Sequence, residues 1–275
     1  MIRLRRLFLA PSWLVTAGLI LAPLAVVLAY SLLTRGVYGG VTLPWTLEQY
    51  ARLWDPLYLR ILLRSFWIAG TSTLFCLLLG FPLALFLARS NRKNLYLSLV
   101  MLPFWTSFLV RTYAWMFLLR DTGLINSTLQ WLGWIHNPLP LLYNDGAVIV
   151  GLVYAYLPFM VLPLYATLER LDPNLVEAAA DLGARPAATL LRVILPLTAP
   201  GVRAGIVLVF IPCLGAYLTP DLLGGGKSVM IGNLIQNQFT TARDWPFGSA
   251  LSLVLMAIVM VLLWLFTRGD SEGLL

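Results

Sequence analysis

Charged side chains are scarce in this chain of 275 residues, because Asp, Glu, Lys and Arg together make up only 11% of it. A soluble protein has roughly 25% charged and about 45–50% apolar residues, whereas this chain is 60% hydrophobic. So little charge excludes a soluble enzyme, and so much apolar surface excludes a disordered chain. The composition therefore predicts a polytopic membrane protein.

Residues that bind metal ions or form disulfides are also few. The chain has two cysteines, Cys76 and Cys213, each inside an apolar stretch, and one histidine, His136, in a predicted loop. We interpret the cysteines as packing residues and expect no metal site. No serine–histidine–acid, paired-carboxylate or zinc-ligand arrangement occurs at membrane depth. We therefore expect no catalytic site, and no cofactor, in this chain.

Basic residues outnumber acidic ones, 19 against 12, and the net charge is +7. In a membrane protein this excess is typical of cytoplasmic loops, so we expect a bilayer and no nucleic acid as its partner. Arg3, Arg5 and Arg6 precede the first apolar stretch, and Arg89 to Lys93 form a tight basic turn. Placing both groups inside puts both termini in the cytoplasm.

Apolar stretches long enough to cross a bilayer recur along the chain. A spanning helix needs about 20 mostly apolar residues. Four stretches of that length have no charged residue, and two weaker ones contain or follow one arginine. We predict an all-α fold, a single membrane domain over residues 1–275, with about six transmembrane helices at 9–33, 66–88, 95–119, 147–168, 202–219 and 248–267.

The predicted cytoplasmic loop, residues 169–200, contains clear helix signals. Asp172 before Pro173 is typical of a helix start, and Gly183 is typical of a helix end. A second helix is predicted to follow, up to about Leu195. The loop therefore predicts a short helix, a sharp corner and a second short helix.

The same loop resembles a motif of the permease subunits of bacterial ABC importers: E-A-A, three residues, G, nine residues, I, one residue, L-P. The matching residues, with Val in place of Ile, are Glu177, Ala178, Ala179, Gly183, Val193, Leu195 and Pro196. In that family this helix docks on the ATP-hydrolysing subunit, so the resemblance implies an ATPase-coupling role. An ordinary amphipathic loop helix is the alternative interpretation.

Four further stretches resemble the permeases of spermidine/putrescine importers: 103–115, 157–163, 181–186 and 243–248. The resemblance implies a multi-pass subunit of the bacterial inner membrane. It also implies two copies of an ATP-binding subunit that hold ATP and Mg, a second homologous permease and an extracytoplasmic solute-binding protein. Ferric iron, thiamine or another organic solute are alternative cargoes. A self-contained secondary carrier, or a membrane enzyme or scaffold, are the alternative classes.

Polyamines carry several ammonium groups, which favour carboxylates and aromatic faces. The candidate residues of the substrate path are Asp221, Tyr217, Trp105, Tyr113, Trp115 and Arg111. Asp221 is the strongest candidate, because it ends the predicted fifth helix near Tyr217 and three glycines.

Arg111 is the only cation well inside a predicted span. On a straight helix from Leu95 it lies roughly 24 Å along the axis, towards the outer interface. Because the Arg111 guanidinium would repel a cationic cargo, we favour a structural salt bridge or gate element over contact with the substrate.

Overall fold

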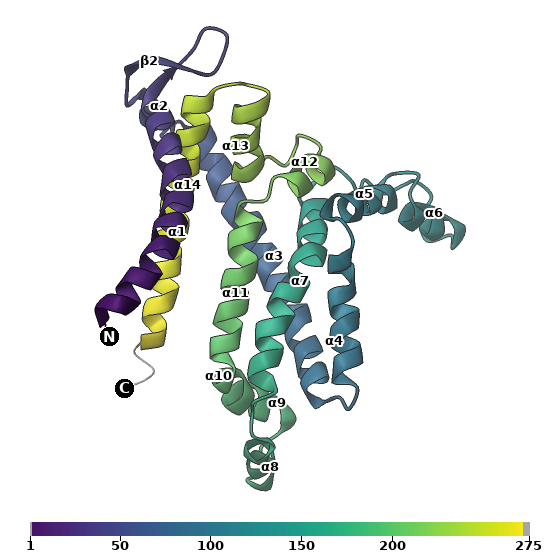
Figure 1. Ribbon diagram of the computed structural model, residues 1–275. Coiled ribbons are helices and arrows are strands. Elements are labelled where there is room, and N and C mark those ends of the chain that lie inside the picture. Colours follow the sequence, from purple (N-terminus) through teal and green to yellow (C-terminus); the bar gives the residue numbers. More distant parts are fainter. Residues whose placement is uncertain (1, 272–275) are drawn as a thin grey trace. The chain divides into compact units, whose positions relative to one another are not determined.

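The computed structural model describes residues 2–271, and side chains from Val15 to Phe266. The described chain consists of helices and one small β-hairpin (Figure 1). It divides into two compact units: residues 1–60 with 234–262, and residues 61–233 with the end of the chain from 263. The basic cluster Arg3, Arg5 and Arg6 lies outside the residues whose side chains are described.

The first unit combines the N-terminal part of the chain with residues 234–262. Its elements are α1 (Ile2–Ser31), β1 (Leu33–Arg35), β2 (Val41–Trp45), α2 (Glu48–Arg52) and most of α14 (Trp245–Ser271). α1 runs beside α14 (Figure 1), and Tyr30 stacks on Trp245 with ring centroids 6.1 Å apart. Arg52 forms an ion pair with Asp244 at 3.0 Å. The antiparallel hairpin was not among the elements predicted from the sequence, which were all helices.

The second unit contains the remaining helices, except that α3 begins in the first unit and most of α13 belongs to the first unit. The elements are α3 (Pro56–Arg89), α4 (Lys93–Met101), the 3-10 helix η1 (Leu102–Trp105), α5 (Phe108–Leu119), α6 (Leu124–Trp131), α7 (Asp145–Leu168), α8 (Pro173–Asp181), α9 (Pro186–Thr189), the π-helical turn η2 (Leu190–Ile194), α10 (Leu195–Leu197), α11 (Ala199–Leu214), α12 (Leu218–Gly224) and α13 (Ile231–Thr240). Three of the short helices, α6, α12 and α13, lie in segments that we had expected to be loops or helix ends.

Close packing of α7 against α11 forms the centre of this unit. Met160, Val161 and Leu164 of α7 are fully buried, as is Val209 of α11. A Cβ at Gly205 would lie 2.5 Å from Met160 Sδ, so the two helices approach this closely only because position 205 has no side chain.

Helices that can cross a membrane are found in most of the predicted places. Among the described residues, three helices are long and apolar enough: α3, α7 and the 245–266 part of α14. Two bent pairs, 93–131 and 186–214, raise the number to five if each pair is one span. The described apolar part of α1 is the shorter segment Val15–Ser31. The predicted all-α membrane fold is confirmed.

The predicted span over 95–119 consists of two helical segments and not of one straight helix. Lys93–Trp105 and Phe108–Trp131 meet at an angle of 89°. Pro103 lacks a backbone donor, which fits the change from α-helix to 3-10 helix at Leu102, and the break itself follows at Thr106. The backbone at Thr106 is extended, with φ −96° and ψ 149°, so the chain leaves α4 and starts α5 in a new direction.

The predicted end of the fifth span, at residue 219, is wrong. α11 ends at Leu214, and a new helix, α12, begins at Leu218. Pro220 would clash with the carbonyl of Ala216 in a continuous helix, whereas proline is well accommodated in a first helical turn. The proline is therefore compatible with the start of α12 and favours a break before it.

Candidate functional site: the coupling loop and the substrate path

The first helix of the predicted coupling loop is α8, and its start is set by a side-chain cap. The Asp172 Oδ1 atom accepts a hydrogen bond from the backbone N–H of Asn174 at 3.0 Å, and Pro173 occupies the first helical position. This cap satisfies a donor that would otherwise have no partner within the helix. The predicted start is confirmed.

The end of α8 is a Schellman motif centred on Gly183. Its φ is 76°, and its N–H donates to the Ala180 carbonyl at 2.8 Å. The N–H of Ala184 donates to the Ala179 carbonyl at 3.0 Å. A residue with a side chain is strained in this left-handed conformation, so glycine is what permits the corner.

The second half of the loop is longer than predicted. α9 begins at Pro186, as expected, and continues through the π-helical turn to Ile194 and then through α10 to Leu197. Ile194 is buried, Val193 is half-buried, and Leu195 and Pro196 are exposed. A bend of 70° then separates this segment from α11. The expected helix, corner and second helix are all present.

The surface of α8 is free of contacts that would bury it. None of its residues is buried, and Glu177 and Ala178 are exposed. Leu175 is 44% exposed and Leu182, just after the helix, is 89% exposed. Within the second unit α8 lies beyond the ends of α7 and α11 (Figure 1). Exposed leucines on a protruding helix favour contact with another protein.

Two adjoining clefts separate α8 from the end of α3. Their volumes are about 500 and about 370 Å³, and both are lined by Leu85, Arg89 and Val176. Glu177 lines the smaller one. Because these clefts separate α8 from α3, a partner that binds α8 can move it without disrupting close packing between the two helices.

An ion pair connects α4 to the beginning of the coupling loop. Lys93 Nζ lies 2.5 Å from Glu169 Oε1, and both side chains are more than one third exposed. The hydrogen bond from Lys93 lowers the pKa of the Glu169 carboxyl. This pair ties the first turn of α4 to the residue that follows α7.

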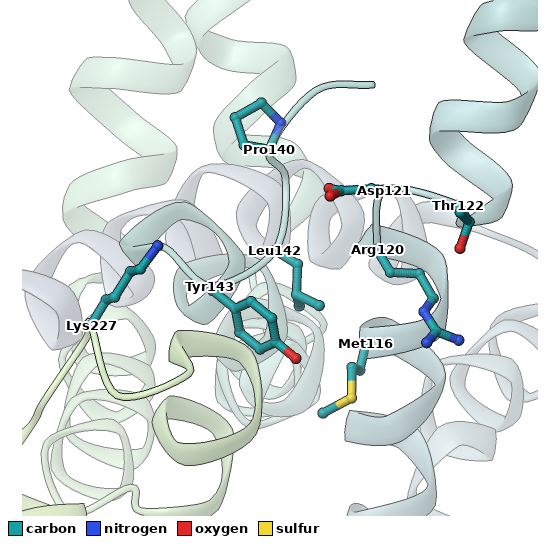
Figure 2. Close-up of a pocket in the computed structure, with 8 residues that line it drawn as sticks. All are labelled: Met116, Arg120, Asp121, Thr122, Pro140, Leu142, Tyr143 and Lys227. Carbon is teal, nitrogen blue, oxygen red and sulfur yellow. The ribbon is translucent and has the colours of Figure 1, made fainter. Parts of the chain in front are cut away.

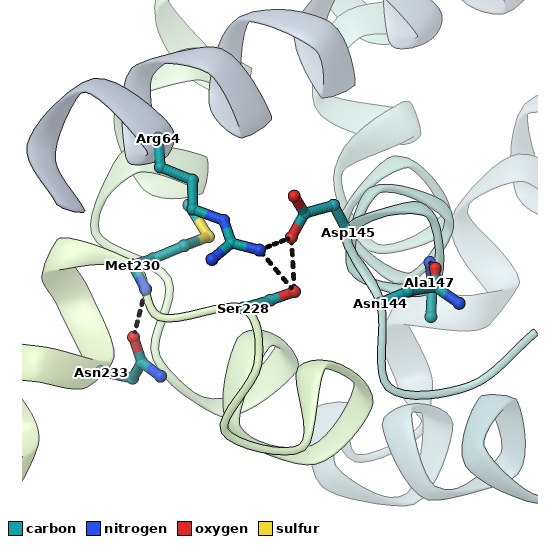
Figure 3. Close-up of polar contacts among 7 residues, drawn as sticks. All are labelled: Arg64, Asn144, Asp145, Ala147, Ser228, Met230 and Asn233. Carbon is teal, nitrogen blue, oxygen red and sulfur yellow. Dashed lines mark hydrogen bonds and ion pairs between the residues drawn. The ribbon is translucent and has the colours of Figure 1, made fainter. Parts of the chain in front are cut away.

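A polar cluster joins three segments (Figure 3) at the start of α7, the end of that helix away from α8 (Figure 1). Arg64 of α3 forms an ion pair of 2.6 Å with Asp145, the first residue of α7, and Ser228 also contacts the Asp145 carboxylate. Ser228 is fully buried, and the Asn144 side chain caps α7 by accepting from the Ala147 N–H at 2.9 Å. The cluster fixes the segment between α12 and α13 to α3 and α7.

A cleft of about 430 Å³ opens at the same end of the unit (Figure 2). Figure 2 shows Lys227 and Arg120 on opposite sides of it, with Tyr143 and Leu142 between them. Asp121, Thr122, Met116 and Pro140 complete the lining. The cleft combines two cations, one carboxylate and an apolar floor.

The predicted path residues are distributed over two helices that contact each other, α5 and α12, and the turn before α5. Tyr217 precedes α12 and is 49% exposed, and Asp221 lies exposed in the first turn of that helix. On α5, Tyr113 is 40% exposed and Trp115 packs edge-on against Tyr154 at 5.6 Å. The sixth residue, Trp105, is 91% exposed beside α4 residues.

Arg111 lies in the first turn of α5, and the break before that helix changes its expected position. The 24 Å estimate assumed a straight helix, whereas α4 and η1 rise only about 20 Å from Lys93 before the chain turns by 89°. Arg111 therefore stays at the depth of the break and does not extend along the α4 axis towards an interface.

The expected salt bridge of Arg111 is replaced by aromatic contacts. Its Nε and Nη1 atoms are buried and have no hydrogen-bond partner among the described residues. The guanidinium carbon lies 5.3 Å from the Phe104 ring centroid and 5.7 Å from that of Phe108. An arginine at the centre of a span costs about 2.5–3.5 kcal/mol, and a desolvated cation–π contact contributes about 2 kcal/mol. Two such contacts are large enough to hold the charge without a carboxylate.

Comparison with known families identifies the chain. Residues 76–269 match the model of a family described as "Binding-protein-dependent transport system inner membrane component". The chain belongs to this family. It is therefore a multi-pass inner-membrane permease, a transport subunit and not an enzyme, of a system that works with a solute-binding protein.

Curated relatives match almost the whole permease. The spermidine/putrescine transport system permease protein PotB of Escherichia coli is 45% identical over 261 residues, covering 94% of each chain. PotB of Salmonella typhimurium is 45% identical over 261 residues, covering 94% of this chain and 90% of the relative. PotB of Haemophilus influenzae is 42% identical over 262 residues, covering 94% and 91%.

Solved structures share the permease fold. A bacterial ABC transporter that imports alginate matches with a TM-score of 0.70, at 17% identity and over 98% of this chain and 99% of that chain. The alginate transporter in complex with its alginate-bound periplasmic protein matches with a TM-score of 0.74, at 18% identity and over 98% and 95%. At this identity the likeness supports the fold alone.

Sequence reasoning missed several polar and aromatic groups of the permease. Neither Arg64 nor Ser228 was a candidate, and Phe104 belonged to the 103–115 resemblance without a role of its own. The one available signal was Arg64 itself, a cation immediately before a long apolar run that begins at Ser65. Its partners could not be chosen, because they lie 81 and 164 residues further along the chain.

Proposed function

We propose that this permease is a membrane subunit of an ABC importer for the polyamines spermidine and putrescine. The observation that carries the proposal is the 42–45% identity to three PotB proteins over 94% of the chain. The likeness covers nearly the whole length of the chain and not a single segment. Half-buried and exposed aromatic side chains on α5 and α7 support a cationic cargo, because ring faces attract ammonium groups.

The coupling loop is the docking site for an ATP-binding subunit, of which the complete importer has two copies. The supporting geometry is the exposed surface of α8, with Glu177 and Ala178 free of burial and Leu182 almost fully exposed. ATP and Mg bind to that partner. A second homologous permease completes the passage, and a solute-binding protein delivers the cargo on the outer face.

Movement of α8 changes the populations of inward- and outward-facing states. The clefts between α8 and the end of α3 provide room for that movement. In this arrangement α8 and both termini are cytoplasmic, and the Arg64–Asp145 cluster lies at the outer end. Asp221, Tyr217, Tyr113 and Trp115 contribute to the path of the cargo.

The test is uptake by the complete importer in cells that have no other polyamine transporter. Radiolabelled spermidine should enter when the permease is produced with its ATPase, sister permease and binding protein. Unlabelled putrescine should compete, whereas ferric iron and thiamine should not. Uptake of iron or thiamine without uptake of spermidine would show that the cargo is different.

A further inference from the structure

Two aromatic side chains contact the guanidinium of Arg111 in the second unit, and two more extend the ring cluster through Phe104. Phe104 and Phe108 lie 5.3 and 5.7 Å from the guanidinium carbon. The Phe104 ring packs edge-on against Phe159 of α7 at 5.0 Å, and Phe159 adjoins Tyr156 at 6.1 Å. We call these four residues, Phe104, Phe108, Tyr156 and Phe159, the aromatic enclosure.

The enclosure stabilises the Arg111 guanidinium through contacts with ring faces, without a carboxylate among the described residues. Arg111 Nε and Nη1 are inaccessible to solvent and lack a hydrogen-bond partner among the described residues. Burial by this chain also keeps a carboxylate of another subunit away from these two atoms. A site that stabilises a cation through ring faces suits organic cations, which give up their hydration more readily than metal ions.

We propose that the aromatic enclosure is a binding site for an ammonium group of the cargo, and that Arg111 occupies it as a tethered substitute in the conformation described here. The identity of the cargo as a polyamine rests on the proposed function. The cation-binding property of the enclosure rests on the geometry of Arg111 alone.

The break before α5 provides a way to empty the site. Thr106 and Ser107 are extended residues between η1 and α5, and the Ser107 side chain makes no cap hydrogen bond. A rotation about this link moves Arg111 and Phe108 together, because both belong to the first turn of α5. Phe104 stays with η1, in contact with Phe159 on α7, and its face becomes available to an ammonium group.

The same arrangement closes the site in the conformation described here. While Arg111 occupies the enclosure, its charge repels a second cation and its side chain fills the space between the rings. Arg111 therefore prevents the cargo from entering until α5 moves. This gives the gate interpretation of Arg111 a specific mechanism.

A tryptophan in place of Phe104 provides a fluorescence signal that changes when a different cation contacts this ring. The complete importer with the F104W variant is purified, and its fluorescence is measured relative to the parent complex during titration with spermidine. In F104W/R111L the apparent affinity for spermidine should be roughly 3- to 30-fold higher than in F104W, because the tethered competitor is gone. F104W/R111K keeps a tethered cation and should resemble F104W.

α5 offers a matched control pair. Arg120 lies 5.2 Å from the Phe117 ring, but this pair is exposed and outside the enclosure. Spermidine should produce no saturable signal in F117W/R120L. The proposal is overturned if F104W/R111L shows no titration, or only the response of F117W/R120L.

Uptake measurements separate this inference from the proposed function. An importer that takes up polyamines while F104W/R111L fails to titrate refutes the enclosure alone. If F104W/R111L binds spermidine in the titration but the parent importer takes up no polyamine, the polyamine assignment is wrong and the cation site is still supported. If the double variant cannot be purified, R111L alone should lower the KM for spermidine uptake in cells, and an unchanged KM contradicts the proposal.

Discussion

Arg64 and Asp145 form an ion pair of 2.6 Å that connects α3 to the first turn of α7. The two residues are 81 positions apart, and the buried Ser228 hydroxyl joins them from a third segment. Three elements of the permease thus meet at one carboxylate, at the end of the unit opposite the coupling loop.

The Arg64→Gln change should reduce stability. It leaves Asp145 with Ser228 as its remaining partner, and we expect a loss of about 1 kcal/mol, because both charged side chains are partly exposed. The measurement is the thermal transition of the purified permease in detergent. Arg60→Gln, one turn earlier on α3 at an exposed position without a described ion pair, is the control. Equal effects of the two changes would contradict the role given to the cluster.

Gly183→Ala should uncouple ATP hydrolysis from uptake. Alanine at φ 76° introduces strain of about 1–2 kcal/mol, which displaces the corner after α8. Gly133→Ala is a close control, because Gly133 has φ 72° and ends α6 with the same pair of backbone hydrogen bonds. We expect normal insertion of both variants and loss of uptake in Gly183→Ala only. Normal uptake in Gly183→Ala would reject the coupling role of this corner.

Leu182→Gln should weaken binding of the ATPase subunit without destabilising the permease. Leu182 is 89% exposed, so its replacement removes no packing from the permease itself. An apolar contact at an interface contributes about 1–2 kcal/mol, which corresponds to roughly 5- to 30-fold weaker binding. The measurement is the affinity of the purified ATPase for the permease in nanodiscs. Leu124→Gln on α6, at a 67% exposed position, should have no effect on that affinity.

The Lys93–Glu169 pair should make a pH-dependent contribution to stability. The hydrogen bond from Lys93 holds the pKa of Glu169 below its ordinary value of 4.5. The contribution is therefore fully present above pH 4.5 and is lost as the pH falls through the lowered pKa. Glu169→Gln should lower the melting temperature at neutral pH and have no effect once the wild-type carboxyl is protonated. A difference that grows towards low pH would have the opposite sign and would contradict this assignment.

Local signals were sufficient for the coupling loop. Asp172 and Pro173 start α8, and Gly183 ends it, through hydrogen bonds between residues no more than five positions apart. Interactions over so short a distance along the chain depend little on the rest of the fold, so the sequence predicted the helix and its corner correctly.

The breaks in the spans show where the sequence was insufficient. Pro103 and Pro220 were visible, but a proline inside an apolar stretch permits a kink, a break or a new helix. Packing against α7 selects among these outcomes, since both α5 and α12 contact that helix. An apolar stretch therefore predicts that the chain enters the membrane, and does not predict its direction after a proline.

Scarce charge and long apolar stretches were enough to establish a helical membrane protein, because the hydrophobic effect and backbone hydrogen bonding in lipid allow few alternatives. They could not reveal which of the few polar groups are partners. Arg64 and Asp145, or Phe104 and the ring of Phe159, meet only after α3, η1 and α7 have packed. Such contacts join residues tens of positions apart, so they are properties of the folded chain and leave no periodic pattern in its sequence.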